Sequence, residues 1–422
     1  MEKYAQILTI ASPMFFLFVT IEKLYGWFKS KDAINSMDLI SSLSSGYTNA
    51  IKDVIGIGVS LITYAWLVDH VALTHIKYTW VNVLIAFVAL DFSGYWGHRI
   101  NHSVNFFWNQ HLIHHSSEEF NLACALRQSI SGLVNFFTIF LLPAALLGVD
   151  FSIVAIIAPI HLFAQFWYHT VYIGKMGWLE HVIVTPSHHR VHHAINPIYL
   201  DKNHGQIFVF WDKWFGTFQE ELADVPPVYG ITTPVRTWNP IKINFVQFWQ
   251  LLQDAFRTNN WQDKFRIWIM PTGWRPADVI EDYPINKIDE PYQYKKYNPL
   301  ASKLLIAFSW IQLSFAFYMQ MYFFSHFGQF SPSQMLMIGA FFYLSIYAYT
   351  ELMDRNNNAF WIELMKSIIG LSLFIYYGGW FGLQNHYPIL NNFVALYFVF
   401  SSLAVGYFVF KEFKEENLQL AL

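Results

Sequence analysis

The chain contains a single cysteine, Cys124, in 422 residues. One thiol excludes an intrachain disulfide and any metal site made from several cysteines. Charged side chains are also scarce: they make up 13% of the sequence, against the roughly 25% of an ordinary soluble domain. The formal net charge is −3, so there is no basic excess that would attract nucleic acid. We therefore expect no disulfide scaffold and no nucleic acid partner.

Apolar sequence takes the place of the missing charge. Hydrophobic residues account for 55% of the chain and aromatic residues for 19%. They occur in stretches close to the length of about 20 residues that a spanning helix needs. The pattern predicts an all-α, polytopic integral membrane helical bundle. The candidate spans are Ile7–Trp27, Val54–Val68, Trp80–Trp96, Leu133–Leu147, Phe151–Tyr172, Leu304–Phe324, Met335–Thr350, Phe360–Gly379 and Leu390–Phe410. The second and fourth are short, so tilted, re-entrant and interfacial placements all remain open. The first has no small-residue cleavage site after it, which favours a retained span over a signal peptide.

Basic residues in the loops predict which way the bundle faces. Most of them fall on one side of the membrane: Lys29, Lys31, Lys52, Arg99, Arg127, Lys175, Arg190, Lys202 and Lys213. The opposite loops contain Lys77 alone. Because cytoplasmic loops are enriched in lysine and arginine, we expect the first side to be cytoplasmic. A hairpin between the fourth and fifth spans, turning at residues 148–150, returns the chain to that side.

Composition divides the chain into three predicted parts. Residues 1–228 form a membrane-embedded, histidine-rich domain, and residues 301–422 a C-terminal region of four transmembrane helices. Residues 229–300 are polar and rich in tryptophan and proline, so they are expected to form an amphipathic cytoplasmic or interfacial connector. Its helical pattern, Ile243–Phe256, predicts a helix that lies on the membrane surface.

Histidines are concentrated close to the ends of the apolar stretches. The three clusters are His98 and His102, then His111, His114 and His115, then His189, His192 and His193. Imidazole is a good transition-metal ligand and an expensive membrane residue, so the clusters predict a metal site. Residues three or four apart face the same side of a helix, so each cluster can direct its rings to one shared point.

The number of imidazoles predicts how many metals they hold. His169, at the cytoplasmic end of the fifth span, is predicted as a ninth ligand, whereas the deeper His161 is expected to be a hydrogen-bonded core residue. Nine ligands exceed the needs of one ion and predict a cytoplasmic-face pair of metals, each with about four imidazoles. Neutral ligands leave the metals strongly positive, which suits oxidation of an unactivated C–H bond with dioxygen, and at the bilayer edge the natural substrate is a lipid. Ligand type alone leaves iron and zinc open.

Four further residues are predicted beside the metals: Asp91, Glu118, His188 and Asp212. Asp91 either orients a ligating imidazole from another segment or is a buried carboxylate bonded to Ser, Tyr or Trp. Asp212 either bonds a ligating histidine or pairs with Lys213 or Arg190. Whether Glu118 binds metal is left open, and His188 is as much a ligand candidate as a neighbour of the ligands.

Two residues after the second cluster have other interpretations. Ser116 and Glu119 are favoured as a capping box that opens the next helix. Arg127 is expected either to meet a lipid headgroup or reduced cofactor, or to extend to the membrane interface as a snorkelling cation.

The clusters and their surroundings resemble the membrane fatty acid hydroxylase and sterol desaturase superfamily. Its members carry a short-spaced histidine pair followed by two His-x-x-His-His triplets. Longer strings are similar to the alkylglycerol monooxygenase branch, namely residues 111–122, 125–129, 185–193, 201–203, 211–218, 229–234 and 273–276. The resemblance covers roughly residues 91–276, and the last four spans match only in general layout.

The resemblance implies a di-iron hydroxylase domain within residues 1–228. Two iron ions and O2 would insert one oxygen atom into a C–H bond of an ether lipid, fatty acyl or sterol-like substrate. Ether-cleaving members are similar in using a reduced pterin (tetrahydrobiopterin) as electron donor, and other members use redox proteins. This chain departs from the ether-cleaving pattern at Ser103, where those relatives tend to carry glutamate, and His204 is a second local difference.

Three alternatives remain beside a hydroxylase. A lipid desaturase starts from the same oxidant and differs only in substrate placement. A zinc-dependent membrane hydrolase needs a general-base carboxylate, for which Glu118 is the candidate. A metal transporter needs ionisable residues that meet near the bilayer midplane, where the sequence offers Asp91 and the predicted pair Glu363 and Lys366.

Overall fold

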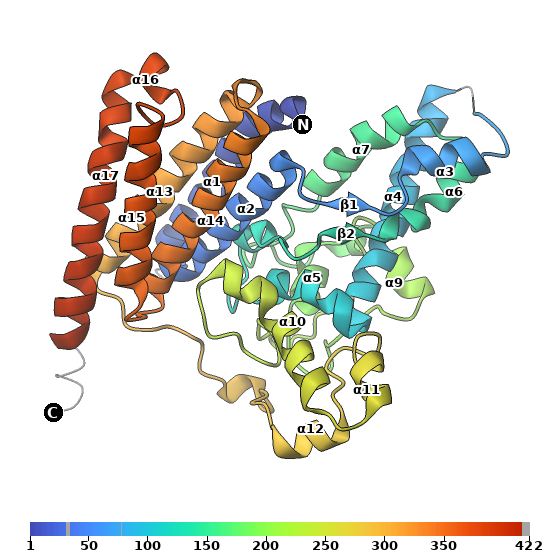
Figure 1. Cartoon of the computed structure of the whole chain (residues 1–422). Helices are drawn as coiled ribbons and strands as arrows, with labels where there is room; N and C mark the ends of the chain where they lie inside the picture. The colour runs from blue at the N-terminus through green and yellow to red at the C-terminus, as the bar shows by residue number, and fades with distance from the viewer. Residues whose placement is uncertain (31–33, 77, 416–422) are drawn as a thin grey trace.

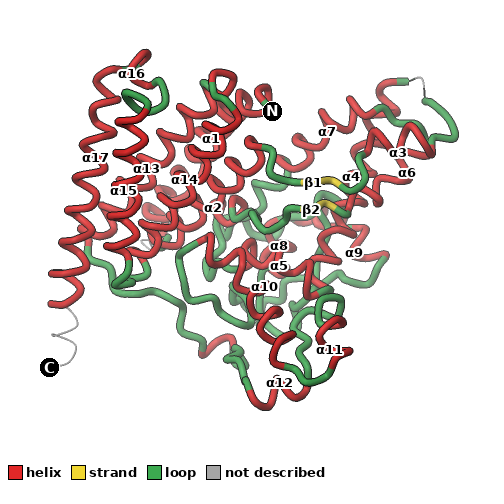
Figure 2. The backbone as a smooth tube through the Cα atoms, in the orientation of Figure 1, coloured by secondary structure: helices red, strands yellow, loops and turns green. Residues whose placement is uncertain are grey.

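Figure 1 shows the computed structural model of the chain, which describes residues 1–30, 34–76 and 78–415. Regular structure in these residues is almost entirely helical (Figure 2), which confirms the predicted all-α class. The helices are α1 (Glu2–Ser30), α2 (Ser36–Ile55), α3 (Tyr64–Val71), α4 (Thr79–Ser103), α5 (Asn105–His115), α6 (Leu142–Leu146), α7 (Phe151–Phe163), α8 (Pro186–His192), α9 (Phe210–Trp214), α10 (Pro240–Arg257), α11 (Trp261–Arg266), α12 (Ala277–Asp282), α13 (Lys303–Ser325), α14 (Pro332–Met353), α15 (Ala359–Tyr376), α16 (Leu383–His386) and α17 (Pro388–Tyr407). A short parallel pair joins β1 (Val59–Ser60) to β2 (Val134–Asn135). Lys31 and Lys77, used in the orientation argument, lie outside the described residues.

Six helices within the described ranges are long and apolar enough to cross a membrane: α1, α4, α13, α14, α15 and α17. They coincide with the first, third and last four of the predicted spans. The chain is therefore a multi-pass membrane protein, as its composition predicts. Within α15, Glu363 and Lys366 form the expected buried ion pair, with 2.6 Å between oxygen and nitrogen.

Within the described residues the other three predicted spans are not continuous membrane-crossing helices, and the re-entrant and interfacial placements left open for the second and fourth stay predictions. Across Val54–Val68 the chain leaves α2 through Gly56 in the left-handed region, passes through β1 and enters α3. Leu133–Leu147 contains β2 and the short α6, and α7 ends at Phe163 rather than at Tyr172. Apolar composition alone cannot distinguish such short helices and turns from a continuous span. These segments are too short to cross a bilayer as single helices.

Helix α2 was not predicted, because serines and charges interrupt its apolar residues. Asn35 caps its first turn by accepting a hydrogen bond from the backbone N–H of Met37, and Gly56 ends it with φ of 78°. Most of its residues are buried, including four of its five serines. It packs against α13 and α14, so a polar helix lies inside the membrane bundle.

The N-terminal helices share a core with the C-terminal ones. Figure 1 shows α1 and α2 among α13, α14 and α15, although some 250 residues separate them in the chain. One hydrophobic cluster joins Leu43 and Ile51 of α2 to Phe323, Phe341 and other residues of the later helices. Residues 122–126 contact both α2 and α5, so the histidine-bearing α5 is joined to this bundle through α2.

A second hydrophobic cluster surrounds the N-terminal half of α4. It joins α3, α4, α6 and α7 through residues such as Leu67, Ala86 and Ala145. The chain turns between α6 and α7 at Gly148, whose φ of 67° suits glycine, and Asp150 caps α7 by accepting from the N–H of Ser152. The turn is where the sequence places it, and it brings the following residues back toward the end of α4.

The connector forms α10, α11 and α12 at the lower edge of Figure 1. Helix α10 includes the predicted Ile243–Phe256 and packs along α5. The side chain of Asn105, at the start of α5, donates to the carbonyls of Ile267 and Trp274 and accepts from the N–H of Gly273. The connector thus holds the turn between α4 and α5 in place, and its membrane-surface location stays a prediction.

Candidate metal centre

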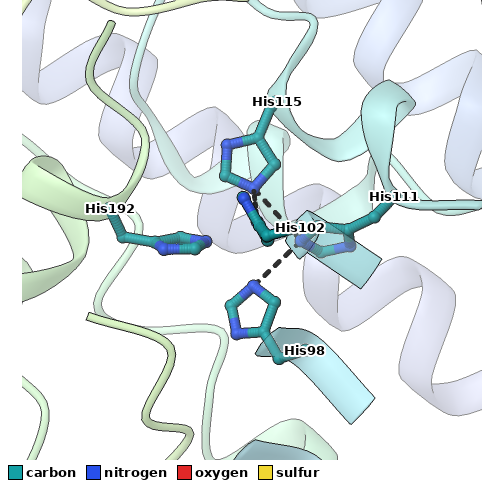
Figure 3. A group of neighbouring side chains, drawn as sticks. All are labelled: His98, His102, His111, His115 and His192. Carbon is teal, nitrogen blue, oxygen red and sulfur yellow. Dashed lines mark hydrogen bonds between the residues drawn. The ribbon is translucent and has the colours of Figure 1, made fainter. Parts of the chain in front are cut away.

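The nine histidines predicted as ligands lie together in two adjoining groups. Within each group the candidate ligand nitrogens all lie within 4.8 Å of one another. The first group, shown in Figure 3, contains His98, His102, His111, His115 and His192, and the second contains His114, His169, His189 and His193. The rings of His115 and His193 stack across the boundary with centroids 4.3 Å apart. We call these the five-histidine group and the four-histidine group.

Four segments carry these side chains. The last turns of α4 carry His98 and His102, and the helix axis then breaks at Val104, where the backbone is extended, before α5 begins. Helix α8 starts at Pro186, a residue well suited to the first position of a helix. His169 comes from the turn after α7, so the early end of that helix places the ninth imidazole.

The two triplets do not each point to one metal, as the sequence interpretation supposed. In α5, His111 and His115 face the five-histidine group, whereas His114 faces the other. In α8 and the residue that follows it, His192 belongs to the five-histidine group, whereas His189 and His193 belong to the four-histidine group. Residues i and i+4 are offset on a helix by about 40°, whereas i+3 lies about 60° to the other side. Each helix therefore lies between the two groups and supplies both.

Backbone carbonyls fix the tautomers of two members of the five-histidine group. Nδ1 of His98 lies 2.9 Å from the carbonyl oxygen of His204, and Nδ1 of His192 lies 2.8 Å from that of Lys202. Because a carbonyl oxygen only accepts, each Nδ1 carries the proton and each Nε2 carries a free lone pair. Nε2 of His98 lies 2.9 Å from Nε2 of His111. Lone pairs are thus gathered on the inner side of the group.

The four-histidine group shows the same arrangement more sharply. His114 and His169 direct their Nδ1 atoms to the carbonyls of Arg127 and Gln165, at 3.3 and 3.1 Å. Both Nε2 atoms are therefore unprotonated, yet they lie 3.4 Å apart. Two lone pairs at this distance cannot form a hydrogen bond with each other. A cation between them is the simplest way to make the arrangement favourable.

The distances fit transition-metal ligation. Two imidazole nitrogens about 2.1 Å from one ion lie about 3.0 Å apart at a right angle and about 3.4 Å apart at a tetrahedral angle. Nε2 contacts in both groups span 2.8 to 3.4 Å. In addition, Nε2 of His192 is buried without a hydrogen-bond partner. The residues present therefore fit two metal ions, one in each group.

Burial keeps these imidazoles neutral. It lowers the pKa of His114 to about 3, and burial together with neighbouring imidazoles holds the pKa of His189 and His193 well below the ordinary value. A neutral imidazole offers a lone pair and a protonated one does not. The ligand set is therefore ready to bind metal throughout the physiological pH range.

A turn at residues 201–204 supplies the carbonyls of the five-histidine group. Asp201 and Asn203 have φ of 55° and 57°, a left-handed conformation that Asp and Asn tolerate better than most residues. The amide of Asn203 donates to the carbonyls of His188 and Gln219. This explains the motif at residues 201–203: it directs the carbonyls of Lys202 and His204 to the imidazoles.

Two buried carboxylates hold the chain that follows this turn. Asp212 accepts from the N–H groups of His204 and Gly205 and from the hydroxyl of Thr217. Asp91 accepts from the N–H groups of Ile207 and Phe208. Both predicted roles for Asp212 are therefore wrong, because it bonds neither a ligating imidazole nor a surface cation. It acts on His98 indirectly, through the carbonyl of His204.

Asp91 also reaches the four-histidine group, by way of α7. It accepts from the indole N–H of Trp211 and from Nε2 of His161, at 2.8 and 2.9 Å. The amide of Gln165 donates to Nδ1 of that histidine, and its carbonyl accepts from His169. Asp91 thus orients an imidazole, but one that lies in neither group. The expectation that His161 is a hydrogen-bonded core residue agrees with this network.

Arg127 has neither of its predicted roles. Its guanidinium is buried and pairs with Asp38 of α2 at 2.7 Å. It also donates to the hydroxyls of Ser42 and Ser116, while its carbonyl orients His114. The ion pair therefore joins α2 to the four-histidine group. The partner was invisible because α2 was not recognised as a helix.

The acidic residues after α5 lie away from both groups. Glu118 accepts from the hydroxyl of Tyr294 and the N–H of Tyr297. Glu119 pairs with Lys296, and α5 ends where the capping box was expected to open a helix, so that interpretation is wrong. The predicted candidate His188 belongs to neither group; its ring bonds the N–H of Thr185 at the start of α8.

Comparison with known proteins agrees with this geometry. The sequence model of the fatty acid hydroxylase family matches residues 83–217, which contain both histidine groups. Alkylglycerol monooxygenase of Homo sapiens is 30% identical over 384 residues, covering 89% of this chain and 84% of that protein. The chain belongs to the alkylglycerol monooxygenase branch of this family.

Other relatives differ in their sequence identity to this chain. Alkylglycerol monooxygenase of Danio rerio is 31% identical over 379 residues, covering 87% of this chain and 82% of that protein. A Delta(7)-sterol 5(6)-desaturase of Gibberella zeae is 24% identical over 169 residues, or 36% of this chain and 47% of that protein. No solved structure matches the chain. Membership makes this chain a membrane lipid hydroxylase of the monooxygenase type.

Proposed function

We propose that the chain is a non-haem di-iron mono-oxygenase that hydroxylates a C–H bond of a membrane lipid. The observation that carries the proposal is the pair of adjoining, buried groups made only of neutral imidazoles. Two iron ions held there would activate O2, so that one oxygen atom enters the lipid and the other is reduced to water. Similarity to the alkylglycerol monooxygenases supports iron over zinc.

The side chains divide the work as follows. The nine imidazoles would bind the two metal ions. In His98, His114, His169 and His192 a backbone carbonyl accepts from Nδ1 and so leaves the lone pair of Nε2 free. Aromatic rings exclude water from the outer sides of the groups. The ring centroid of Phe120 lies 5.2 Å from that of His193, and the ring centroid of Trp108 lies 5.1 Å from that of His102. A water-poor site protects a strong oxidant from side reactions.

For the substrate, we propose a lipid with a long alkyl chain, either an ether lipid of the alkylglycerol class or a fatty acyl or sterol-like lipid. A reduced pterin, such as tetrahydrobiopterin, is the proposed electron donor, with a redox protein as the alternative. Similarity to the ether-cleaving branch supports both assignments. Ser103 is the departure from that branch; its hydroxyl donates to the carbonyl of Arg99 within α4.

A lipid desaturase with the same metal pair is the second candidate. The similarity to a sterol desaturase over 169 residues favours it. A zinc hydrolase lacks support, since neither group contains a carboxylate among the described residues. A transporter lacks support as well, because Glu363 and Lys366 pair with each other inside α15.

We further propose that the metal pair faces the cytoplasm, which the distribution of lysine and arginine supports. The proposed division is a hydroxylase domain (1–228), a connector (229–300) and a C-terminal region (301–422).

The function is tested by removing one ligand from the five-histidine group. His111→Ala and His192→Ala should abolish oxygen-dependent turnover while the protein remains in the membrane. Protein purified without oxygen should contain about two irons per chain, since five and four imidazoles suit two ions, and each variant should contain less. Retained turnover in either variant would contradict the proposal. Lipid analysis of membranes with and without the protein, supplied with isotopically labelled O2, identifies the product and separates a hydroxyl group from a double bond.

A further inference from the structure

His204 is a buried histidine beside the five-histidine group that the nine predicted ligands do not include. Only 2% of its surface is exposed. Its carbonyl accepts the hydrogen bond of His98, so its backbone already belongs to the surroundings of the metal. Its side chain is unexplained by that role.

The ring of His204 lies only slightly farther from three of the ligand rings than those rings lie from one another. Its centroid is 5.0 Å from the ring of His102, 5.5 Å from that of His98 and 5.6 Å from that of His192. The centroids of those three ligands are separated by 4.3 to 5.2 Å. His204 is thus a tenth imidazole in the wall of the site.

Hydrogen bonding also gives its tautomer. Nε2 lies 3.1 Å from the carbonyl oxygen of Asp201, and since a carbonyl only accepts, Nε2 carries the proton. Nδ1 therefore has a free lone pair. This atom is buried and has no hydrogen-bond partner. A buried polar atom without a partner is uncommon and indicates an unseen water molecule or ion.

The same pattern marks four predicted ligands. His98, His114, His169 and His192 each donate one ring N–H to a backbone carbonyl and keep the other nitrogen bare. In His204 the two nitrogens have exchanged roles. It is nevertheless outside the set whose ligand atoms all lie within 4.8 Å, so in this arrangement it cannot share one ion with all five.

We propose that His204 holds a water molecule against the metal of the five-histidine group, with Nδ1 accepting the hydrogen bond of that water. The inference rests on the proposed function in that a metal must be bound there. His204 is a positioning residue: it fills one place beside the ion with a molecule that donates a hydrogen bond. Partners of this kind affect metal affinity about 10–100-fold.

Two substitutions separate the nitrogens of this ring. In His204→Asn the amide group lies where Nδ1 lies, whereas the contact with Asp201 is lost. In His204→Gln the longer side chain reaches the position of Nε2 and keeps the contact with Asp201, but nothing replaces Nδ1. His204→Phe keeps the ring and removes both nitrogens.

The measurement is iron retention by each full-length protein, purified without oxygen in detergent, as a chelator is titrated. We expect His204→Gln and His204→Phe to bind one of the two irons about 10–100-fold more weakly than the wild type. His204→Asn should remain within a few-fold of the wild type. The matched control is His188→Gln, because His188 is buried beside the ligands but belongs to neither group. Glutamine is one of the two usual residues at its capping position, so this control should leave retention unchanged.

Three outcomes would overturn the inference. Wild-type retention in all three variants would show that the side chain has no part in metal binding. Weaker binding in His204→Asn than in His204→Gln would assign the effect to the Asp201 contact. Loss of the folded protein in His204→Asn, measured by thermal stability in detergent, would show a purely structural side chain. A wild-type protein that binds no iron contradicts the proposed function itself, whatever the order of the variants.

Discussion

At the scale of single residues, Asp91 is the side chain that serves both histidine groups. Its carboxylate accepts four hydrogen bonds, two from the backbone after the 201–204 turn and two from Trp211 and His161. The first pair steadies the carbonyl that orients His98. From the imidazole of His161, hydrogen bonds continue through Gln165 to His169. A residue that touches neither group therefore positions ligands in each.

Asp91→Asn should disturb both metals. Each carboxylate oxygen accepts two hydrogen bonds, and an amide nitrogen in either position would face two donors. We expect a loss of stability on the order of 2–3 kcal/mol, typical of hydrogen bonds to a charged group. Iron content should fall in both groups, measured by metal analysis and spectroscopy of the purified variant. Loss confined to one group would contradict the shared role.

The low pKa values of the ligands predict a dependence on pH. In the folded protein the pKa of His114 is about 3, and that of His189 is well below the ordinary value, whereas in the unfolded chain both are about 6.5. Above that pH neither state takes up protons here, so stability is unaffected. As the pH falls below it, the unfolded chain binds protons first and becomes favoured.

Thermal stability and bound iron should therefore decline together between about pH 6.5 and pH 5. The check is the melting temperature and metal content of the protein across that range. A melting temperature that rises on acidification would contradict the depressed pKa values.

Some residues were predictable from sequence and others were not. Spacing identified eight of the nine histidines, and His169 was predicted from its place at the end of an apolar stretch. Asp91 and Asp212 were recognised as important, but their partners are backbone groups, which no side-chain pattern reveals. The role of Arg127 depends on Asp38, about 90 residues away in the chain. Such pairs follow only from the fold.

At the scale of helices, α2 shows how a polar segment can lie inside a membrane bundle. Two of its buried serines show how: Ser42 donates to the carbonyl of Asp38, and Ser44 meets the hydroxyl of Tyr349. Hydropathy alone selects helices that face lipid, so α2 was missed, whereas the six long apolar helices were predicted. The segments after α2 were misassigned because their apolar residues belong to short helices and turns.

Asp38→Asn tests the link between α2 and the metals. Breaking a buried ion pair leaves an unpaired charge on Arg127 and costs about 3–5 kcal/mol. Because the carbonyl of Arg127 orients His114, iron loss should be greatest in the four-histidine group.

The control for this substitution is Asp53→Asn, the same chemical change on the same helix. Its ion pair with Lys52 is partly exposed, and such pairs contribute about 1 kcal/mol or less. Thermal unfolding and metal analysis compare the two variants. Equal effects from both would show that the buried pair has no special role.

At the scale of the whole molecule, the chain folds back on itself around α2. One face of α2 packs against α13 and α14, and another reaches the four-histidine group through Asp38. Composition predicted membrane regions at both ends of the chain correctly. It did not predict that the first two helices share a core with the last ones, because contacts between distant segments are not encoded in local pattern.

Deletion of residues 301–422 should therefore destabilise the metal site although no ligand is removed. The deletion exposes the apolar side of α2, including Leu43 and Ile51, and exposure of each such side chain costs about 1.5–3 kcal/mol. We expect the truncated protein to lose iron and to be degraded. Co-expression of residues 1–300 and 301–422 as separate chains should restore iron binding. A stable, iron-loaded truncated protein would show that residues 1–300 fold alone.

The interleaving of ligands along α5 and α8 has a consequence for assembly. Each of these helices gives imidazoles to both groups and, with His193 at the end of α8, together they carry three ligands of each, so the first ion to enter holds in place most of the ligands for the second. In the wild-type protein, loading should then be cooperative, and the single-iron form should be a minor species. An oxidase that is either complete or empty avoids the half-filled state, in which one reactive metal would meet oxygen without its neighbour.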